Sequence, residues 1–302
     1  MVILIDSGNS RIKLGLMTAQ RGEPDAAVNR AWVTPIQPLT TSAFANEDLA
    51  GVRQWLAVHL AQSDVVRAEA VDSDIPGIPT RAKPAWGVNV AGSAQQAALD
   101  AVFGEFGYTI AWHKASARQG RLINGYTLPT QLGADRWASL LGVMGRTPRV
   151  HPPILLASFG TATTIDLIGP DDVFEGGVIL PGPLMMARAL AYGTANLPLA
   201  QGTSALFPKD TSGAIATGIS SAQAGAVLRQ YLLAHAQYKV APTVYVAGGA
   251  WEGVETETRR LLDQTSLSLL GRPAHIETLQ HPVLDGLALI AGDLLAEKGT
   301  GQ

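Results

Sequence analysis

A strand–turn–strand pattern that occurs twice constrains the fold of this 302-residue chain more than any other feature. At residues 2–17, an apolar β-branched run leads into turn-forming residues, and an extended pattern then resumes. Residues 154–168 repeat this order, and Gly8 aligns with Gly160 at an offset of 152 residues, close to half of the chain. The offset predicts a duplicated fold whose two copies each begin with a hairpin, although two unrelated hairpins would give the same pattern.

Helical and extended patterns alternate along both halves of the chain. The sequence predicts further strands at residues 85–90, 108–112 and 243–246, and helices at residues 46–61, 91–103, 134–144, 214–236 and 283–297. Strands interleaved with helices are typical of the α/β class. The polar segment 145–149 is the best candidate for a domain boundary, which predicts domains at residues 1–148 and 149–302.

Charge and composition exclude several classes of function. The formal net charge is −3 and the chain has no basic run, so we do not expect nucleic acid as the main partner. Cysteine is absent, which excludes disulfides, thiolate metal sites and cysteine nucleophiles. The first residues lack the features of a signal peptide, and Asp285 and Asp293 interrupt the apolar C-terminal segment. We therefore expect a cytoplasmic protein without a membrane span.

The first turn has the composition of a phosphate-binding site. Gly8 can adopt a positive φ, and successive N–H groups in such a turn can form a concave anion site. Asp6 would repel a phosphate unless Mg²⁺ lay between them, and Lys13 adds a positive charge. The alternative interpretation is an ordinary hairpin turn, because the same residue types are common in turns.

Two further segments carry candidate chemistry. The second turn, at residues 158–164, offers backbone N–H groups and three threonine hydroxyls, but threonine is also common in plain strands. Asp135 and Arg136 stand at the start of a predicted helix. They could form a simple cap and ion pair, or Asp135 could be the base of a phosphoryl transfer. The six histidines lack metal-ligand spacing and are predicted to be surface or structural residues.

Taken together, these segments resemble the type III pantothenate kinases. The resemblance rests on D-S-G-N-S-R-I-K at 6–13, Y-T-L-P-T-Q-L-G-A-D-R-W at 126–137, G-T-A-T-T-I-D at 160–166, G-G-V-I-L-P-G at 176–182, D-T-S-G-A-I-A-T-G at 210–218 and A-G-G-A at 247–250. It extends over essentially the whole chain. It implies duplicated ribonuclease-H-like domains of the actin-like ATPase superfamily, with the active site in the cleft between them. The implied reaction is ATP-dependent phosphorylation of pantothenate to 4′-phosphopantothenate, the first step of coenzyme A biosynthesis.

The resemblance also implies roles for individual residues. It assigns Asp135 as the catalytic base and Asp6 as the residue that holds Mg²⁺ through water. It assigns contacts to ATP and its phosphates to Asp6, Ser7, Gly8, Asn9, Ser10, Arg11, Ile12, Lys13, Gly160 and Thr161. It assigns contacts to pantothenate to Tyr126, Gly133, Ala134, Asp135, Arg136 and Thr211. Because the family contributes the Thr211 contact from a second subunit, a homodimer with a shared active site is implied.

One departure from the family pattern concerns a monovalent cation. The family commonly has an aspartate two residues before the second-turn glycine, where it binds potassium or ammonium, but Ser158 stands here. A neutral hydroxyl is a weaker cation ligand than a carboxylate, so we expect weaker or altered cation dependence. Ser10 replaces a usual threonine and keeps the hydroxyl, and Ala250 stands near a position that is often acidic.

Two other functions remain open. The chain could be a kinase for another small hydroxyl compound, or a non-catalytic nucleotide-binding accessory or regulatory protein of the same fold. A protein that had lost catalysis would be expected to have lost its base or a phosphate loop. Asp6, Lys13, Asp135 and Arg136 are all present, which favours the enzyme. A purely structural α/β protein is the least favoured interpretation.

Overall fold

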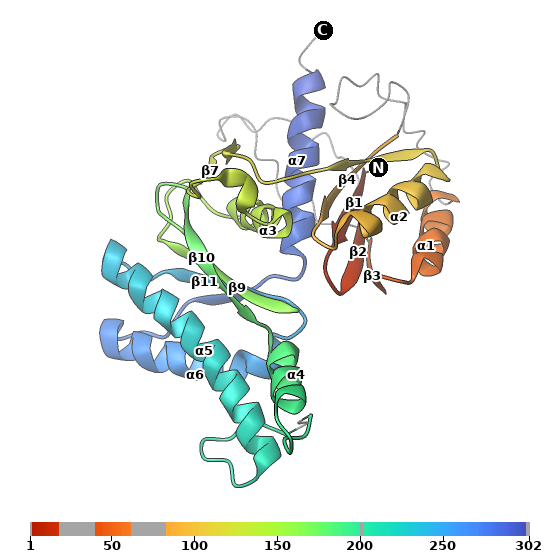
Figure 1. The fold of residues 1–302 in the computed structure, drawn as a ribbon. Coiled ribbons are helices and arrows are strands. Elements are labelled where there is room, and N and C mark those ends of the chain that lie inside the picture. Colours follow the sequence, from red (N-terminus) through yellow and green to blue (C-terminus); the bar gives the residue numbers. More distant parts are fainter. Residues whose placement is uncertain (1, 18–39, 62–82, 200–201, 300–302) are drawn as a thin grey trace. The chain divides into compact units, whose positions relative to one another are not determined.

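The computed structural model forms two compact units, each built around one β-sheet (Figure 1). The structure describes residues 2–17, 40–61, 83–199 and 202–299. The first unit comprises residues 1–117, 128–147 and 281–302, and the second comprises residues 118–127 and 148–280.

The first unit contains a five-stranded sheet in the order β3-β2-β1-β4-β5. Its strands are β1 (Val2–Ser7), β2 (Arg11–Met17), β3 (Thr40–Ala45), β4 (Lys83–Asn89) and β5 (Tyr108–Trp112). The strands β1, β2 and β3 are antiparallel, whereas β4 and β5 run parallel to β1. The helices of this unit are α1 (Leu49–Ala61), α2 (Ser93–Gly104), the short 3₁₀ turn η1 (Pro129–Gln131), α3 (Ala134–Met144) and α7 (Pro282–Gly299).

Helices cover both faces of this sheet (Figure 1). Ile3 and Ile5 of β1 and Leu14 of β2 form a hydrophobic core with apolar residues of α1 and α2. Successive side chains of a strand point to opposite faces. The side chains of Asp6 and Lys13, which are paired across the β1–β2 ladder, therefore point to the other face, where α3 and α7 pack.

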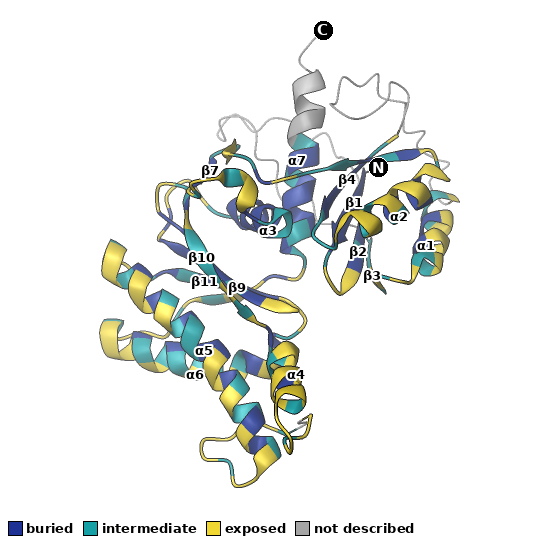
Figure 2. Cartoon of the chain, in the orientation of Figure 1, coloured by how far each residue is buried: buried dark blue, intermediate teal, exposed yellow. Residues whose placement is uncertain are grey.

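The second unit contains a seven-stranded sheet in the order β12-β11-β8-β9-β10-β7-β6. Its strands are β6 (Arg118–Gln119), β7 (Leu122–Asn124), β8 (Ile154–Phe159), β9 (Ala162–Ile168), β10 (Val173–Pro181), β11 (Thr243–Ala247) and β12 (Ile276–Thr278). Its helices are α4 (Pro183–Gly193), α5 (Thr211–Tyr238) and α6 (Glu252–Leu270). Apolar residues of α5 and α6 pack on β8, β9 and β11, which leaves the opposite sides of both helices exposed (Figure 2).

Five strands of the second sheet share the topology of the whole first sheet, which confirms the predicted duplication and the α/β class. In the second unit, β8, β9 and β10 are antiparallel and β11 and β12 run parallel to β8, as β1 to β5 do in the first. Moving β1 by the predicted offset of 152 residues gives the bounds of β8. The second hairpin turn is shorter than predicted, because Ser158 lies in β8 and Thr163 and Thr164 lie in β9.

The two units interleave along the chain. Residues 118–127 belong to the second unit because β7 pairs with β10, and residues 281–302 belong to the first because α7 packs against α3. The units therefore differ in both segments from the predicted division into residues 1–148 and 149–302.

Helices α3 and α7 approach each other closely through glycines. A side chain at Gly286 would collide with the carbonyl group of Ala138, and one at Gly142 would collide with the carbonyl oxygen of Pro282. Arg146, two residues after the end of α3, also forms an ion pair with Asp285 of α7 at 2.7 Å, with the carboxylate almost completely buried. Rigid packing of this kind fixes the position of α3, whose first turn carries Asp135.

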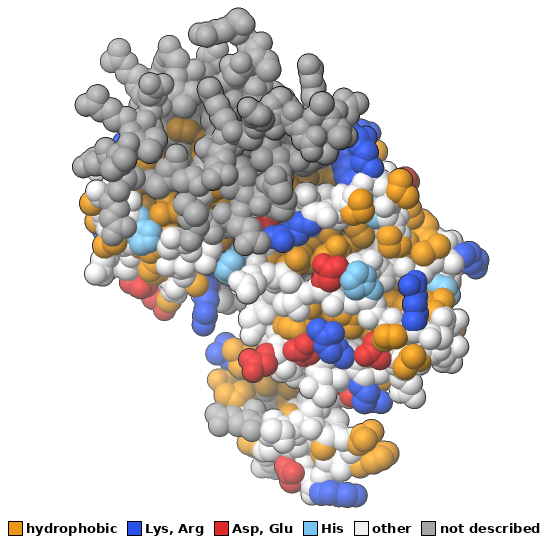
Figure 3. Space-filling view, turned by 180° about the vertical axis from the view of Figure 1, so that it is seen from behind, with side chains coloured by type: hydrophobic (Ala, Val, Ile, Leu, Met, Phe, Trp, Pro, Cys, Tyr) orange, Lys and Arg blue, Asp and Glu red, His pale blue; other side chains and the backbone are white. Residues whose placement is uncertain are grey.

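The surface mixes charged and apolar side chains. Figure 3 shows acidic and basic groups interspersed on the face in view, with hydrophobic side chains between them. Within the described residues, none of the helices combines the length and apolar character needed to cross a bilayer.

Candidate functional site

The first hairpin turn is held by bonds from its own backbone and from a neighbouring segment. The N–H of Gly8 donates to the carbonyl of Arg11 at 3.0 Å. The side-chain amide of Asn46, just after β3, donates to the carbonyls of Gly8 and Asn9, both at 3.0 Å. These bonds orient the turn before any ligand arrives, which is a form of preorganisation. No local sequence pattern marks Asn46 as a site residue, because the carbonyls that it binds lie 38 and 37 positions away in the chain.

A second asparagine fixes the end of β1. The hydroxyl of Ser7 is completely buried and donates to Oδ1 of Asn89 at 2.9 Å. The same oxygen accepts from the N–H of Ala91 at 3.1 Å, and the Asn89 amide donates to the carbonyl of Gly92 at 2.9 Å. Asn89 thus joins the ends of β1 and β4 beneath the turn. It is a second residue that sequence patterns did not reveal.

Asp6 and Lys13 form an ion pair at the base of the turn. Lys13 Nζ lies 3.0 Å from Asp6 Oδ2, and the Asp6 residue is only 4% exposed. A nearly buried carboxylate needs a compensating charge, and Lys13 supplies it. The lysine side chain is itself partly exposed, so its ammonium group can also meet an anion from solvent.

Asp135 stands in the first turn of α3 with an unusual electrostatic environment. Its Oδ1 accepts from the N–H of Arg136 at 2.8 Å, and a side chain at Gly133 would crowd the same oxygen. Burial raises the pKa of Asp135 above its ordinary value, and the nearby negative charge of Asp6 raises it further. The sequence predicted both carboxylates as site residues, and the structure brings them within electrostatic reach of each other in one unit.

The remaining residues of the first turn differ in what they can offer a ligand. Asn9, Ser10 and Arg11 are exposed. Ile12 is fully buried in the core beside α1 and α2, so it can contribute only its backbone. The side chain of Arg136 is also buried, at the start of α3.

The second hairpin turn is packed between two glycines of its own unit. Gly182, which precedes α4, donates its N–H to the carbonyl of Thr161 at 3.0 Å. A side chain at Gly182 would collide with the carbonyl of Gly160, and one at Gly248 would collide with that of Phe159. The absence of a side chain at Gly182 and Gly248 therefore allows the neighbouring backbone to pack closely against this turn.

The other predicted site residues of the second unit are Tyr126, Thr211 and Ser158, and each lies in a different element or loop. The N–H of Tyr126 donates to Asn124 Oδ1 at 3.1 Å, and its ring packs on Phe174 with centroids 5.3 Å apart. Thr211 is the exposed first residue of α5, just after the N-cap residue Asp210. Ser158 is half-buried near the end of β8.

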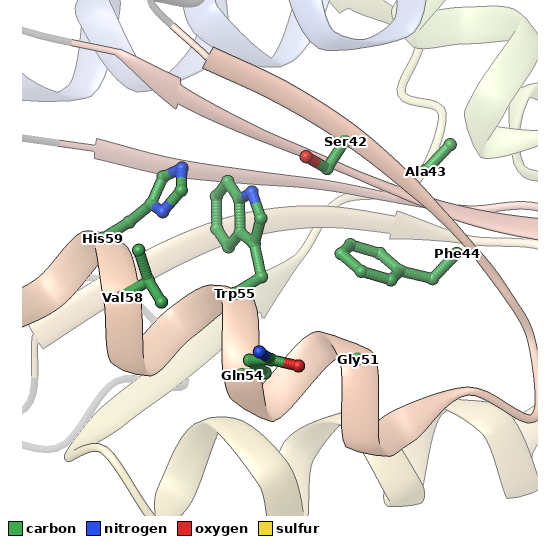
Figure 4. A pocket seen from close by; sticks show the side chains of 8 residues that line it. All are labelled: Ser42, Ala43, Phe44, Gly51, Gln54, Trp55, Val58 and His59. Atoms are coloured by element: carbon green, nitrogen blue, oxygen red, sulfur yellow. The ribbon is translucent and has the colours of Figure 1, made fainter.

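A separate open pocket of about 400 Å³ lies between β3 and α1 (Figure 4). Ser42 and Phe44 line it from β3, and Trp55 and His59 line it from α1, with their rings stacked at 4.5 Å. None of the predicted site residues lines this pocket.

The raised pKa of Asp135 predicts that its charge costs stability. A carboxyl group whose pKa is higher in the folded than in the unfolded state is destabilising once pH rises above both values. Asp135→Asn keeps the acceptor for the Arg136 N–H and cannot ionise, so we expect a larger free energy of unfolding than wild type at pH 7. The difference should shrink as pH falls below the unfolded-state value of about 4. Urea unfolding of both proteins at pH 7 and below about pH 4 measures this difference in the free energy of unfolding.

Glu105→Gln is a suitable control of opposite sign. The hydrogen bond from Arg53 lowers the pKa of Glu105, so removal of this charge should not stabilise the protein at pH 7. An Asp135→Asn variant that is less stable than wild type at pH 7 would contradict the electrostatic account.

Comparisons with known proteins identify the family of this chain. The family model of the type III pantothenate kinases matches residues 2–232. The chain is 48% identical over 291 residues to the type III pantothenate kinase of Bordetella pertussis, covering 96% of this chain and 97% of that protein. It is 34% identical over 293 residues to the type III pantothenate kinase of Aromatoleum aromaticum, covering 96% and 98%.

A solved structure shows the fold. The component A of the (R)-2-hydroxyglutaryl-CoA dehydratase of Acidaminococcus fermentans superposes with a TM-score of 0.50 at 12% identity, covering 98% of both chains. The duplicated ribonuclease-H-like fold of actin-like ATPases and sugar kinases is thereby confirmed. Because the family model matches most of the chain and the relatives match nearly all of it, this chain belongs to the type III pantothenate kinase family.

Proposed function

We propose that this chain transfers the γ-phosphoryl group of ATP to pantothenate, giving 4′-phosphopantothenate in the first step of coenzyme A biosynthesis. Membership of the family supports the reaction. The observation that carries the mechanism is the grouping, in the first unit, of the Asp6–Lys13 pair at a fixed turn with Asp135 at the start of α3. Phosphoryl transfer needs this combination of a phosphate cradle, a positive charge and a carboxylate that orients the acceptor.

Asp135 would act on the acceptor hydroxyl. The pantothenate oxygen forms a bond to the γ-phosphorus, the bond from that phosphorus to the β–γ bridging oxygen breaks, and ADP leaves. The hydroxyl proton passes to the Asp135 carboxylate. A raised pKa makes a carboxylate a better proton acceptor near neutral pH.

The other contacts are proposed residue by residue. The turn from Asp6 to Lys13 would hold the phosphates of ATP, and the turn at Gly160 and Thr161 would have the same role in the second unit. Tyr126, Thr211 and residues 133–136 would contact pantothenate. The first turn has the rigidity that the role needs, because Asn46 and Asn89 hold it.

Asp6 would hold Mg²⁺, through water. Mg²⁺ commonly binds one or two protein carboxylates and completes its coordination with water and phosphate oxygens. A single nearly buried carboxylate near a phosphate turn fits this preference. When bound, the ion would neutralise charge on the phosphate oxygens.

A coupled ADP-release assay tests the function. We expect ADP release to require ATP and pantothenate together, and Asp135→Asn to lower kcat to background because no group then accepts the proton. The exposed loop variant Asp171→Asn is the matched control and should keep wild-type activity.

The same assay separates the alternatives. Release with another small alcohol but not with pantothenate would identify a different kinase. Nucleotide binding without turnover on any alcohol would favour the accessory protein. Near-normal kcat in the folded Asp135→Asn variant would contradict the role of Asp135.

We also propose weak or altered dependence on potassium or ammonium. The carboxylate that the family pattern provides for a monovalent cation is replaced here by the hydroxyl of Ser158. A titration of potassium chloride against sodium chloride should change the rate little, whereas Ser158→Asp should introduce potassium activation. Strong activation of the wild type at low millimolar potassium would contradict this proposal.

We propose a homodimer in which Thr211 of one subunit completes the pantothenate site of the other. The exposed position of Thr211 at the start of α5 supports this. Large apolar side chains also lie exposed in α4 and just before α5, including Tyr192 at 81% and Phe207 at 80%. Exposed apolar groups of this size are typical of protein interfaces.

Light scattering measures the mass of the assembly. We expect a dimer for wild type, and a shift to monomer with loss of activity for the double variant Tyr192→Ser, Phe207→Ser. Val150→Ser removes an equally exposed apolar side chain outside these elements and should leave the dimer intact. A fully active monomer would overturn the shared site.

A cytoplasmic location is proposed as well, because the reaction draws on cytoplasmic ATP and the chain contains no cysteine. Cell fractionation with an antibody to the protein tests it.

A further inference from the structure

His281 joins the last helix of the chain to the sheet that carries the first phosphate turn. Its Nε2 lies 3.3 Å from Oγ1 of Thr41 in β3, although the two residues are 240 positions apart in sequence. The carbonyl of His281 also accepts from the N–H of Asp285 at 2.9 Å, which closes the first turn of α7. The histidine is therefore fixed at both its backbone and its side chain.

The strand register explains why α7 meets this part of the sheet. Thr41 is paired with Gly15, and Ala43 is paired with Lys13. Paired residues and those two positions away share a face of a sheet. Thr41 therefore lies on the same face as Lys13 and Asp6, which is the face against which α7 packs.

The charged groups around His281 come from three elements. Burial lowers the pKa of His281, and the charge of Lys13 in β2 lowers it further, against opposite effects of Asp285 in α7 and Asp6 in β1. The imidazole is thus neutral at neutral pH and adds no charge beside the Asp6–Lys13 pair. Its Nδ1 is buried and has no hydrogen-bond partner among the residues that the structure describes.

Helix α7 is also locked to the helix that carries Asp135. The close contacts of Gly142 and Gly286, together with the Arg146–Asp285 ion pair, make α3 and α7 one rigid block. The side chain of His281 extends from this block to β3. Its bond to Thr41 is a direct link between the block with Asp135 and the sheet with the phosphate turn.

We propose that His281 is a positioning residue, whose bond to Thr41 holds the first phosphate turn in a fixed place relative to Asp135. This inference rests on the proposed phosphoryl transfer for its effect on rate, but not for its effect on the hairpin itself. A change of about 1 Å between reacting groups can reduce a rate by about a hundredfold. A single hydrogen bond at this point can therefore influence turnover without contacting either substrate.

A double-mutant cycle tests the proposal. Thr41→Val and His281→Leu each remove one side of the bond. We expect each to lower kcat about tenfold with little change in the KM for pantothenate, and we expect the double variant to be no slower than either single one. Thr41→Ser keeps the hydroxyl and should retain wild-type kcat. His275→Leu removes an exposed histidine of the second unit and should have no effect.

A second measurement does not depend on activity. Hydrogen exchange of the backbone amides of residues 8–13, read by mass spectrometry, should be several-fold faster in each single variant than in wild type. Exchange in the double variant should be no faster than in either single variant. Thermal unfolding confirms that each variant is folded. Unchanged exchange and unchanged kcat, or additive losses of kcat, would overturn the proposal. If wild type lacks kinase activity but exchange responds as expected, the proposed function fails and the positioning role stands.

Discussion

The alternation of side chains along β1 and β2 is the constraint on which the first unit depends. Burial of Ile3 and Ile5 against α1 and α2 obliges Asp6 to face the opposite side of the sheet. The antiparallel register then places Lys13 beside Asp6 on that side. A slip of either strand by one residue would move its charged group into the hydrophobic core, where its desolvation would be costly. The packing that builds the core thus also places Asp6 and Lys13 side by side at the turn for which we propose a phosphate-binding role.

Two carboxylates near one turn create an electrostatic cost that the protein only partly relieves. Lys13 compensates Asp6 directly, at 3.0 Å. Asp135 has a bond from a backbone N–H, yet burial and the charge of Asp6 still raise its pKa. A strained charge distribution of this kind is typical of sites selected for chemistry rather than for stability. The magnesium nucleotide that we propose as a ligand of this site would change this balance.

Helix α7, late in the sequence, packs against α3 and against strands from the first part of the chain. Its glycine contacts with α3 leave no room for side chains, and His281 extends from its start to Thr41. The helix is rich in leucine and alanine, so a helical prediction for residues 283–297 needed only local composition, and α7 spans Pro282–Gly299. Its assignment to the first unit depends on the packing surfaces of α3, which no local pattern encodes.

The sequence alone determined the two hairpins, their offset and the helix at residues 134–144, because turn chemistry and periodicity mark these elements. The site roles of Asp6 and Asp135 were implied by the family resemblance, because locally an ordinary hairpin turn and a helix cap explain the same residues. Local signals were weaker elsewhere: α6 is rich in charged and polar residues and was not predicted, and the threonines after Gly160 suit turns and strands equally. Only the tertiary structure decided the hydrogen bonds of Asn46, Asn89 and His281. Their partners lie tens to hundreds of residues away, and a hydrogen bond between such segments exists only after the fold has brought them together.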